Sequence, residues 1–174
     1  GISIDEPIDV TYDGEEHKWA PTVTLPDEED TRLVENVDYT VSYNTENFIN
    51  VQTIVVTITG KGNYTGEFTR TYQITPAPLS ITTDSDTKVY DGKPLKADGR
   101  IEGLVNGEKV TFTVTGSQTI VGTSDNTYTL EFNQTAKEGN YSIADKDIHV
   151  GKLTVTAQSI DPEDPDYSGI SIDD

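Results

Sequence analysis

The chain has 174 residues, carries a formal net charge of −19, and contains neither cysteine nor methionine. This negative charge argues against partners such as nucleic acid or anionic membrane surfaces, which both require a cationic footprint. A disulfide framework is excluded, and no apolar run approaches the roughly 18 residues needed to insert into a membrane.

The first half alternates apolar and polar residues with the period of a β-strand. Residues 39–43, 51–59 and 67–75 are rich in β-branched and aromatic side chains and are predicted to be strands. The acidic stretch 27–35 fits a charged turn at least as well as a short helix. No segment has the pattern of an amphipathic helix of ten residues.

The second half has the same character. Residues 110–115, 127–132 and 149–156 are predicted strands, and threonine occupies many of the alternate positions in both halves. Between two apolar stretches, Asn106-Gly107 is a strong signal for a two-residue hairpin.

The two halves repeat one another. Tyr-Asp-Gly at 12–14 returns at 90–92, 78 positions later, and Gly-Asn-Tyr at 62–64 returns at 139–141, 77 positions later. Internal repetition at a fixed period is the signature of array architectures. We therefore expect two related modules.

A longer period is also present. Gly-Ile-Ser-Ile-Asp at 169–173 repeats residues 1–5 at an offset of 168. This predicts that the chain comes from a tandem array whose period is the pair of modules. The neighbours expected for this chain are then further repeats of the same kind.

These patterns divide the chain into three parts. Residues 1–77 form a first β-rich repeat and residues 78–157 a second one, with prolines at 76 and 78 stiffening the connection. Residues 158–174 form an acidic linker with two prolines and the start of the next repeat. The spacing of short strands and turns predicts an all-β fold with two small Ig-like sandwiches in an elongated arrangement.

Several motifs resemble the YDG/MBG-type repeats, which are β-rich modules of bacterial surface proteins related to the repeats of mucin-binding proteins. The second half resembles them over 88–95, 103–107, 110–116, 121–122 and 139–143, and the first half over 12–14, 37–43 and 58–66. Together these motifs cover roughly residues 8–157. Some relatives are described as β-grasp-like, which gives an alternative fold that requires a helix.

The resemblance implies an extracellular protein on the surface of a Gram-positive bacterium, anchored to the cell wall outside this sequence. Such repeats form arrays in large adhesins and in multi-domain secreted enzymes. The family carries no catalytic residues that transfer to this chain. In the Tyr-Asp-Gly turn, glycine permits a positive φ, aspartate closes the turn through its side chain, and the tyrosine ring packs beneath it.

The sequence offers few residues that could serve in catalysis. The two histidines, His17 and His149, occupy non-equivalent places in the repeats, and nothing around them indicates a nucleophile and an orienting acid. We expect no enzyme, no catalytic residue and no cofactor.

Calcium is the best metal hypothesis, because it binds carboxylate and carbonyl oxygens. The candidate ligands are Asp161, Asp164 and Asp166 in the acidic linker, with Asp84 and Asp86 as a second possible set. No segment matches the EF-hand loop, and a solvated acidic linker is the alternative.

Two further hypotheses concern single residues. Trp19 is the sole tryptophan and the candidate for stacking on a sugar ring, although a lone tryptophan is more often part of a core. An intramolecular crosslink through a lysine on a strand, such as Lys109 or Lys152, would resist tension in a chain without cysteine. The alternation places both lysines toward solvent.

The expected function is that of a non-enzymatic, monomeric spacer in the stalk of a surface adhesin. The threonine-rich strand faces favour this interpretation over its alternatives. The first alternative is a repeat that itself binds mucin, another host glycoprotein or a polysaccharide. The second is an accessory module of a secreted glycan-active enzyme.

Overall fold

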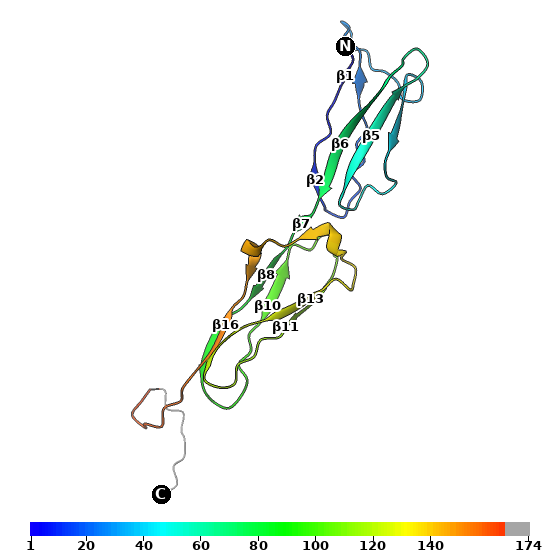
Figure 1. The fold of residues 1–174 in the computed structure, drawn as a ribbon. Coiled ribbons are helices and arrows are strands. Elements are labelled where there is room, and N and C mark those ends of the chain that lie inside the picture. The colour runs from blue at the N-terminus through cyan, green and yellow to red at the C-terminus, as the bar shows by residue number, and fades with distance from the viewer. Residues whose placement is uncertain (166–174) are drawn as a thin grey trace. The chain divides into compact units, whose positions relative to one another are not determined.

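The computed structural model describes residues 1–165 as two compact units (Figure 1). Unit 1 comprises Gly1–Ala77 together with Gly139–Tyr141, and unit 2 comprises Pro78–Glu138 with the described residues from Ser142 onward. The regular structure is almost entirely β-strand, which confirms the all-β prediction. Within residues 1–165 there is no α-helix, the element that a β-grasp requires.

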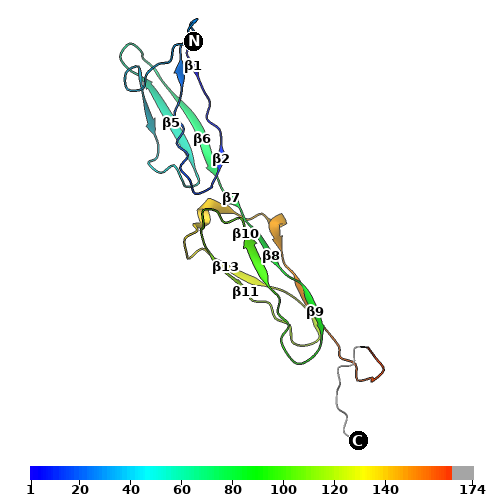
Figure 2. The same cartoon turned by 180° about the vertical axis from the view of Figure 1, so that it is seen from behind.

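Unit 1 contains a four-stranded sheet in the order β2-β6-β5-β4 and a two-stranded sheet that pairs β1 with β3. Its strands are β1 (Ser3–Ile4), β2 (Val10–Thr11), β3 (Val23–Thr24), β4 (Tyr39–Tyr43), β5 (Gln52–Gly60) and β6 (Glu67–Thr75). Figure 1 and the reverse view in Figure 2 both show β5 and β6 running side by side. The predicted strands 39–43 and 67–75 have the predicted bounds, and 51–59 is displaced by one residue.

The alternation in β5 explains how this sheet forms. Ile54, Val56 and Ile58 are buried on one face, whereas Thr53 is exposed on the other. Successive strand residues point to opposite faces, so a period of two places these three apolar side chains in the core, whereas Val55 lies on the other face. Each such buried side chain stabilises the folded state by about 1.5–3 kcal/mol.

The acidic stretch between β3 and β4 is a turn, in agreement with the first of the two predicted options. The Asp27 carboxylate accepts a hydrogen bond from the Thr31 N–H at 2.9 Å, and the Leu25 N–H donates to the Thr31 carbonyl at 2.9 Å. Asp30 has a φ of 48°, which no helix would allow.

Unit 2 contains the sheets β10-β8-β15, β12-β16-β9 and the pair β11-β13. Its strands are β8 (Ser80–Thr83), β9 (Asp86–Val89), β10 (Gly99–Glu102), β11 (Thr111–Val114), β12 (Gly122–Asp125), β13 (Tyr128–Glu131), β15 (Ile148–His149) and β16 (Lys152–Thr156). The short elements near the unit boundary are β7 (Ala77–Pro78), β14 (Tyr141–Ser142) and the 3-10 helices η1 (Glu138–Asn140) and η2 (Asp145–Asp147). Figure 2 shows β11 and β13 together, as their register requires.

A buried polar centre links the strands of unit 2. Asn126, fully buried between β12 and β13, donates from its amide nitrogen to the carbonyls of Asp84 at 2.9 Å and Ala97 at 3.2 Å. Thr83 donates its hydroxyl to the Asn126 carbonyl at 2.7 Å. Buried polar groups require such partners, so Asn126 fixes where three segments meet.

Two predictions for this half are wrong in detail. Asn106 and Gly107 do form a turn, with φ of 55° and 66°, but the flanking β10 and β11 belong to different sheets and form no hairpin. The predicted strand 149–156 is divided at Gly151, where an added Cβ would lie 2.4 Å from the Asp84 carbonyl oxygen. The close approach of the Asp84 backbone therefore interrupts the strand that the alternating pattern predicts.

Both units pair an early strand with their last strand in parallel. In unit 1, Val10 on β2 lies opposite Ile74 on β6, and in unit 2, Lys88 on β9 lies opposite Val155 on β16. Val10 and Lys88 are 78 positions apart, the offset of the two Tyr-Asp-Gly motifs, and Ile74 and Val155 are 81 positions apart. The sequence repeat is thus also a repeat of strand register.

Candidate functional site

The Tyr-Asp-Gly turns have the geometry that the sequence predicts. In the first turn, Asp13 accepts a hydrogen bond from the Glu15 N–H at 2.9 Å, and Gly14 has a φ of 80°. In the second, Asp91 accepts from the Lys93 N–H at 2.9 Å, and its glycine has the same φ. An aspartate that caps the amide two residues ahead stabilises a turn without any ligand.

The aspartate of each turn also contacts the side-chain nitrogen of a nearby residue, and that residue differs between the two turns. The imidazole Nε2 of His17 lies 2.8 Å from Asp13, and the ammonium of Lys88 lies 2.8 Å from Asp91. The hydrogen bond to His17 lowers the pKa of Asp13, and the hydrogen bond to Lys88 lowers the pKa of Asp91. His17 therefore has a structural partner that sequence reasoning did not assign.

The two turn tyrosines differ in how far their side chains are buried. Tyr12 is 5% exposed and packs its ring in the core, as predicted. Tyr90 is 39% exposed. Its hydroxyl lies 3.8 Å from the position of a Cβ on Gly92, so the Tyr90 ring lies against the turn without being buried in a core.

Trp19, the predicted ligand residue, is half-buried beside a shallow groove in unit 1. The Tyr72 hydroxyl accepts from the Trp19 N–H at 3.2 Å and donates to the His17 carbonyl at 2.6 Å. The Tyr43 hydroxyl donates to the Trp19 carbonyl at 2.8 Å. Two tyrosines thus hold the backbone of this segment in place.

The groove beside Trp19 encloses about 290 Å³. Its walls include Ile8, which is 77% exposed, and the polar residues Glu16 and His17. An indole next to an open apolar side chain with flanking polar groups is compatible with a sugar ring stacked on the groove.

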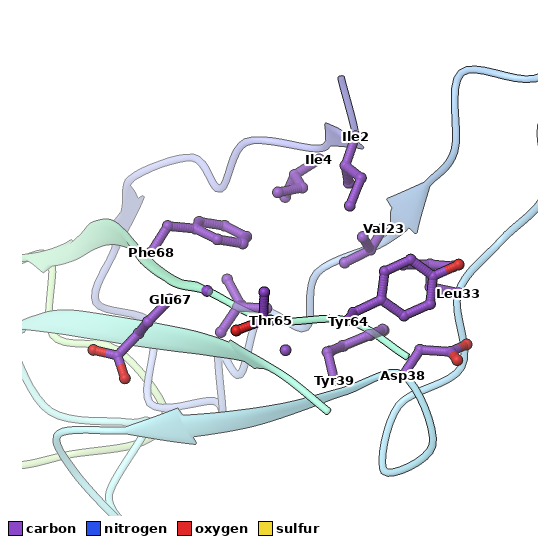
Figure 3. Close-up of a pocket in the computed structure, with 13 residues that line it drawn as sticks. Ile2, Ile4, Val23, Leu33, Asp38, Tyr39, Tyr64, Thr65, Glu67 and Phe68 are labelled. Carbon is purple, nitrogen blue, oxygen red and sulfur yellow. The ribbon is translucent and has the colours of Figure 1, made fainter. Parts of the chain in front are cut away.

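A second cavity of about 300 Å³ lies between the β1-β3 pair and the main sheet of unit 1 (Figure 3). Its lining is Ile2, Ile4, Val23, Leu33, Asp38, Tyr39, Ile58, Gly60, Tyr64, Thr65, Gly66, Glu67 and Phe68. Sequence reasoning missed this cavity, although the alternation of Ile2 and Ile4 indicates one apolar face of a strand.

The two acids of this cavity do not form a reactive pair. Figure 3 shows the carboxylates of Asp38 and Glu67 at opposite sides of the cavity, with apolar side chains between them. Asp38 accepts a hydrogen bond from the Val34 N–H at 2.7 Å, which assigns it to the loop before β4. Burial raises the pKa of Tyr39 on the cavity wall. The lining favours apolar contact over proton transfer.

The predicted calcium ligands have the following places. Asp161 accepts a hydrogen bond from the Glu163 N–H at 3.0 Å, and the Asp164 N–H donates to the Asp161 carbonyl at 3.0 Å, which describes a local turn. Asp166 lies outside the described residues. No group of three or more potential ligands converges within residues 1–165.

The remaining sequence candidates lie on the surface. Asp84 forms an ion pair with Arg100 at 3.2 Å. Lys152 pairs with Asp125 on the neighbouring strand and is 62% exposed, in the orientation that the alternation predicts. Lys109 is also exposed. No helix in the described part of the chain has the length and hydropathy to cross a membrane.

Comparison with known proteins gives one match. The family model of the YDG domain matches residues 75–148, from the last residue of β6 to the first residue of β15. Neither the curated proteins nor the solved structures contain a significant match to the chain. The match includes the second Tyr-Asp-Gly turn, on whose residues the resemblance was predicted. The second repeat of the chain is therefore similar to the YDG domain over residues 75–148.

Proposed function

We propose that the chain is a non-enzymatic pair of spacer repeats in the stalk of a large, extracellular bacterial surface adhesin. In this role it projects a terminal functional module away from the cell wall of a Gram-positive cell. Its partners are then neighbouring repeats of the same protein, and it acts as a monomer. Each repeat is proposed to be an Ig-like sandwich.

The observation that carries this proposal is the shared construction of the two repeats. Both close an early strand against the last strand in parallel, and both follow that early strand with an aspartate-capped turn. What the repeats have in common is thus structural: register, turns and core. A spacer needs this regularity, because its length is set by the number of similar repeats.

The strand faces give further support. Thr69 and Thr71 on β6 and Thr113 on β11 are exposed, and Thr123 and Thr154 pair their hydroxyls across β12 and β16 at 3.1 Å. Threonine favours strands while remaining compatible with water. Together with the net charge of −19, such faces keep neighbouring stalks soluble and apart.

A second candidate function is direct recognition of mucin or another glycan, and the groove at Trp19 favours it. The groove combines a half-buried indole with the exposed Ile8 and with polar flanks. Under this alternative each first repeat is an adhesive unit. An accessory role in a secreted glycan-active enzyme is compatible with the same groove.

Binding of the chain to immobilised mucin and to a polysaccharide panel separates these functions. The spacer proposal predicts no saturable binding, with calcium or with a chelator. Saturable binding that is lost in Trp19→Ala and kept in Thr69→Ala, an exposed change away from the groove, would replace the spacer by the adhesive function. Dependence of that binding on calcium would also establish the metal hypothesis.

A further inference from the structure

We propose that Tyr90, Ile120 and Val121 form a docking surface, the Tyr90 surface, for the Asn63–Tyr64 turn of another copy of this chain. The occupant is thus the first repeat of a following copy, joined end to end. This inference rests on the tandem-array part of the proposed function, and it specifies how copies are joined.

The corresponding surface of unit 1 shows what such a surface binds. Unit 1 includes Gly139–Tyr141, and within it the ring of Tyr141 packs edge-on against Tyr12, with 5.6 Å between centroids and 82° between planes. The Asn140 side chain accepts from the Val51 N–H at 2.9 Å and donates to the Asn50 side chain at 3.1 Å. A Gly-Asn-Tyr turn therefore occupies the surface of Tyr12, Asn50 and Val51.

Strand register shows that Tyr90 is the equivalent of Tyr12. The Tyr12 N–H donates to the Thr75 carbonyl at 2.7 Å, and the Tyr90 N–H donates to the Thr156 carbonyl at 2.8 Å. Both tyrosines follow a strand that pairs in parallel with the last strand of its repeat. The two tyrosines therefore occupy equivalent positions in the sheets of their repeats.

The same register assigns Ile120 and Val121. These residues directly precede β12, whose Gly122 lies opposite Val155, just as Asn50 and Val51 precede β5, whose Gln52 lies opposite Ile74. Tyr90, Ile120 and Val121 thus occupy the places that bind the Gly-Asn-Tyr turn in unit 1.

Exposure distinguishes the two surfaces. Tyr12 is 5% exposed, whereas Tyr90, Ile120 and Val121 are 39%, 70% and 55% exposed. Three exposed apolar side chains at one end of the β12-β16-β9 sheet, on so acidic a chain, indicate an interaction site.

The proposed incoming turn is exposed in the complementary way. Asn140 and Tyr141 are buried, at 4% and 7% exposure, whereas Asn63 is exposed and Tyr64 is half-buried. Tyr64 lies on the wall of the apolar cavity, on the side opposite Phe68 (Figure 3). Each half of the proposed joint is therefore open in the described residues of a single copy.

The sequence indicates which type of repeat follows the second repeat. Residues 169–173 repeat residues 1–5, so a repeat of the first type follows the second repeat in the pattern. Its Asn63–Tyr64 turn then meets the Tyr90 surface. Ile120 replaces Asn50, so the bond between the two asparagine side chains is exchanged for apolar contact, while the Val121 amide remains the counterpart of the Val51 amide.

A two-copy chain tests this joint, with residues 1–168 followed directly by a complete second copy. Trp19→Phe in the first copy leaves a single tryptophan, in the first repeat of the second copy. Its fluorescence during urea unfolding reports the repeat that docks on the Tyr90 surface of the first copy. We compare Tyr90→Ala placed in the first copy with the identical change in the second copy.

We expect the first-copy change to lower the urea midpoint of the reporting repeat, and the second-copy change to leave it unaltered. Tyr64→Ala in the second copy should abolish the effect of first-copy Tyr90→Ala, as a double-mutant cycle requires for a direct contact. Equal midpoints for the two placements of Tyr90→Ala would overturn the joint. That result would leave the spacer function standing, whereas glycan binding by the single chain would overturn the spacer and leave the joint standing.

Discussion

Asp13 and Asp91 perform the same task in the two repeats, because each carboxylate accepts the amide hydrogen two residues ahead at 2.9 Å. Their second partners differ: His17 follows its aspartate by four positions, and Lys88 precedes its aspartate by three. The turn is thus maintained by the aspartate and the following glycine, while the charged partner is drawn from whichever neighbouring residue reaches it.

Acid should weaken the second turn through Asp91. Its pKa is lowered by the hydrogen bond from Lys88 and by that from the Lys93 amide, so the carboxylate is more acidic in the folded chain than in the unfolded one. A lowered pKa contributes stability above the ordinary value of about 3.9 and loses it as the pH falls through the folded value. Asp91→Asn should therefore lose less stability than the wild type between pH 7 and pH 2.5, as measured by urea unfolding.

The exposed Asp145→Asn in η2 is the matched control for this experiment, because it removes one charge without removing a turn bond. It should retain the full acid sensitivity of the wild type. If Asp145→Asn and Asp91→Asn reduce the sensitivity equally, net charge rather than the turn is responsible.

Gly92→Ala should destabilise the chain by about 1–2 kcal/mol, the cost of a left-handed conformation for a residue with a Cβ. Gly92 has a φ of 80°, and an added Cβ would meet only the Tyr90 hydroxyl at 3.8 Å, so the cost is conformational rather than steric. Gly92→Asn should cost less, because asparagine tolerates this region. Calorimetric unfolding of both variants measures the difference, and equal losses would show that the φ is not the cause.

Asn126→Ala should lower the free energy of unfolding by roughly 2–6 kcal/mol, because the carbonyls of Asp84 and Ala97 both lose their buried donor and each such loss costs about 1–3 kcal/mol. Circular dichroism during urea unfolding measures it. Asn133→Ala, on an exposed asparagine, should remain within about 1 kcal/mol of the wild type. Comparable effects of the two changes would contradict the proposed role of burial.

Tyr72→Phe should loosen the segment that carries Trp19. Its hydroxyl donates to the His17 carbonyl and accepts from the Trp19 amide, and loss of these bonds leaves two backbone groups unpaired at a cost of about 1–3 kcal/mol. Because Trp19 is the sole tryptophan, its fluorescence reports unit 1 alone. Tyr128→Phe in unit 2 should leave the fluorescence transition unchanged.

Most of the strands and turns could be predicted from the sequence, because both depend largely on local chemistry. The period-two alternation of Ile54, Val56 and Ile58 requires a strand with one buried face. Glycine after aspartate is sufficient to predict a turn with positive φ. The repeat in the sequence reappears in the strand register, because equivalent residues lie in equivalent pairs.

The tertiary structure alone decided what happens between distant segments. Asn126 is polar and lies in a polar stretch, so no local pattern reveals that it binds the carbonyls of Asp84 and Ala97. The break at Gly151 arises from the approach of another backbone segment. Likewise, the same Tyr-Asp-Gly motif gives a buried Tyr12 and an exposed Tyr90, because burial depends on which residues, remote in sequence, cover the ring.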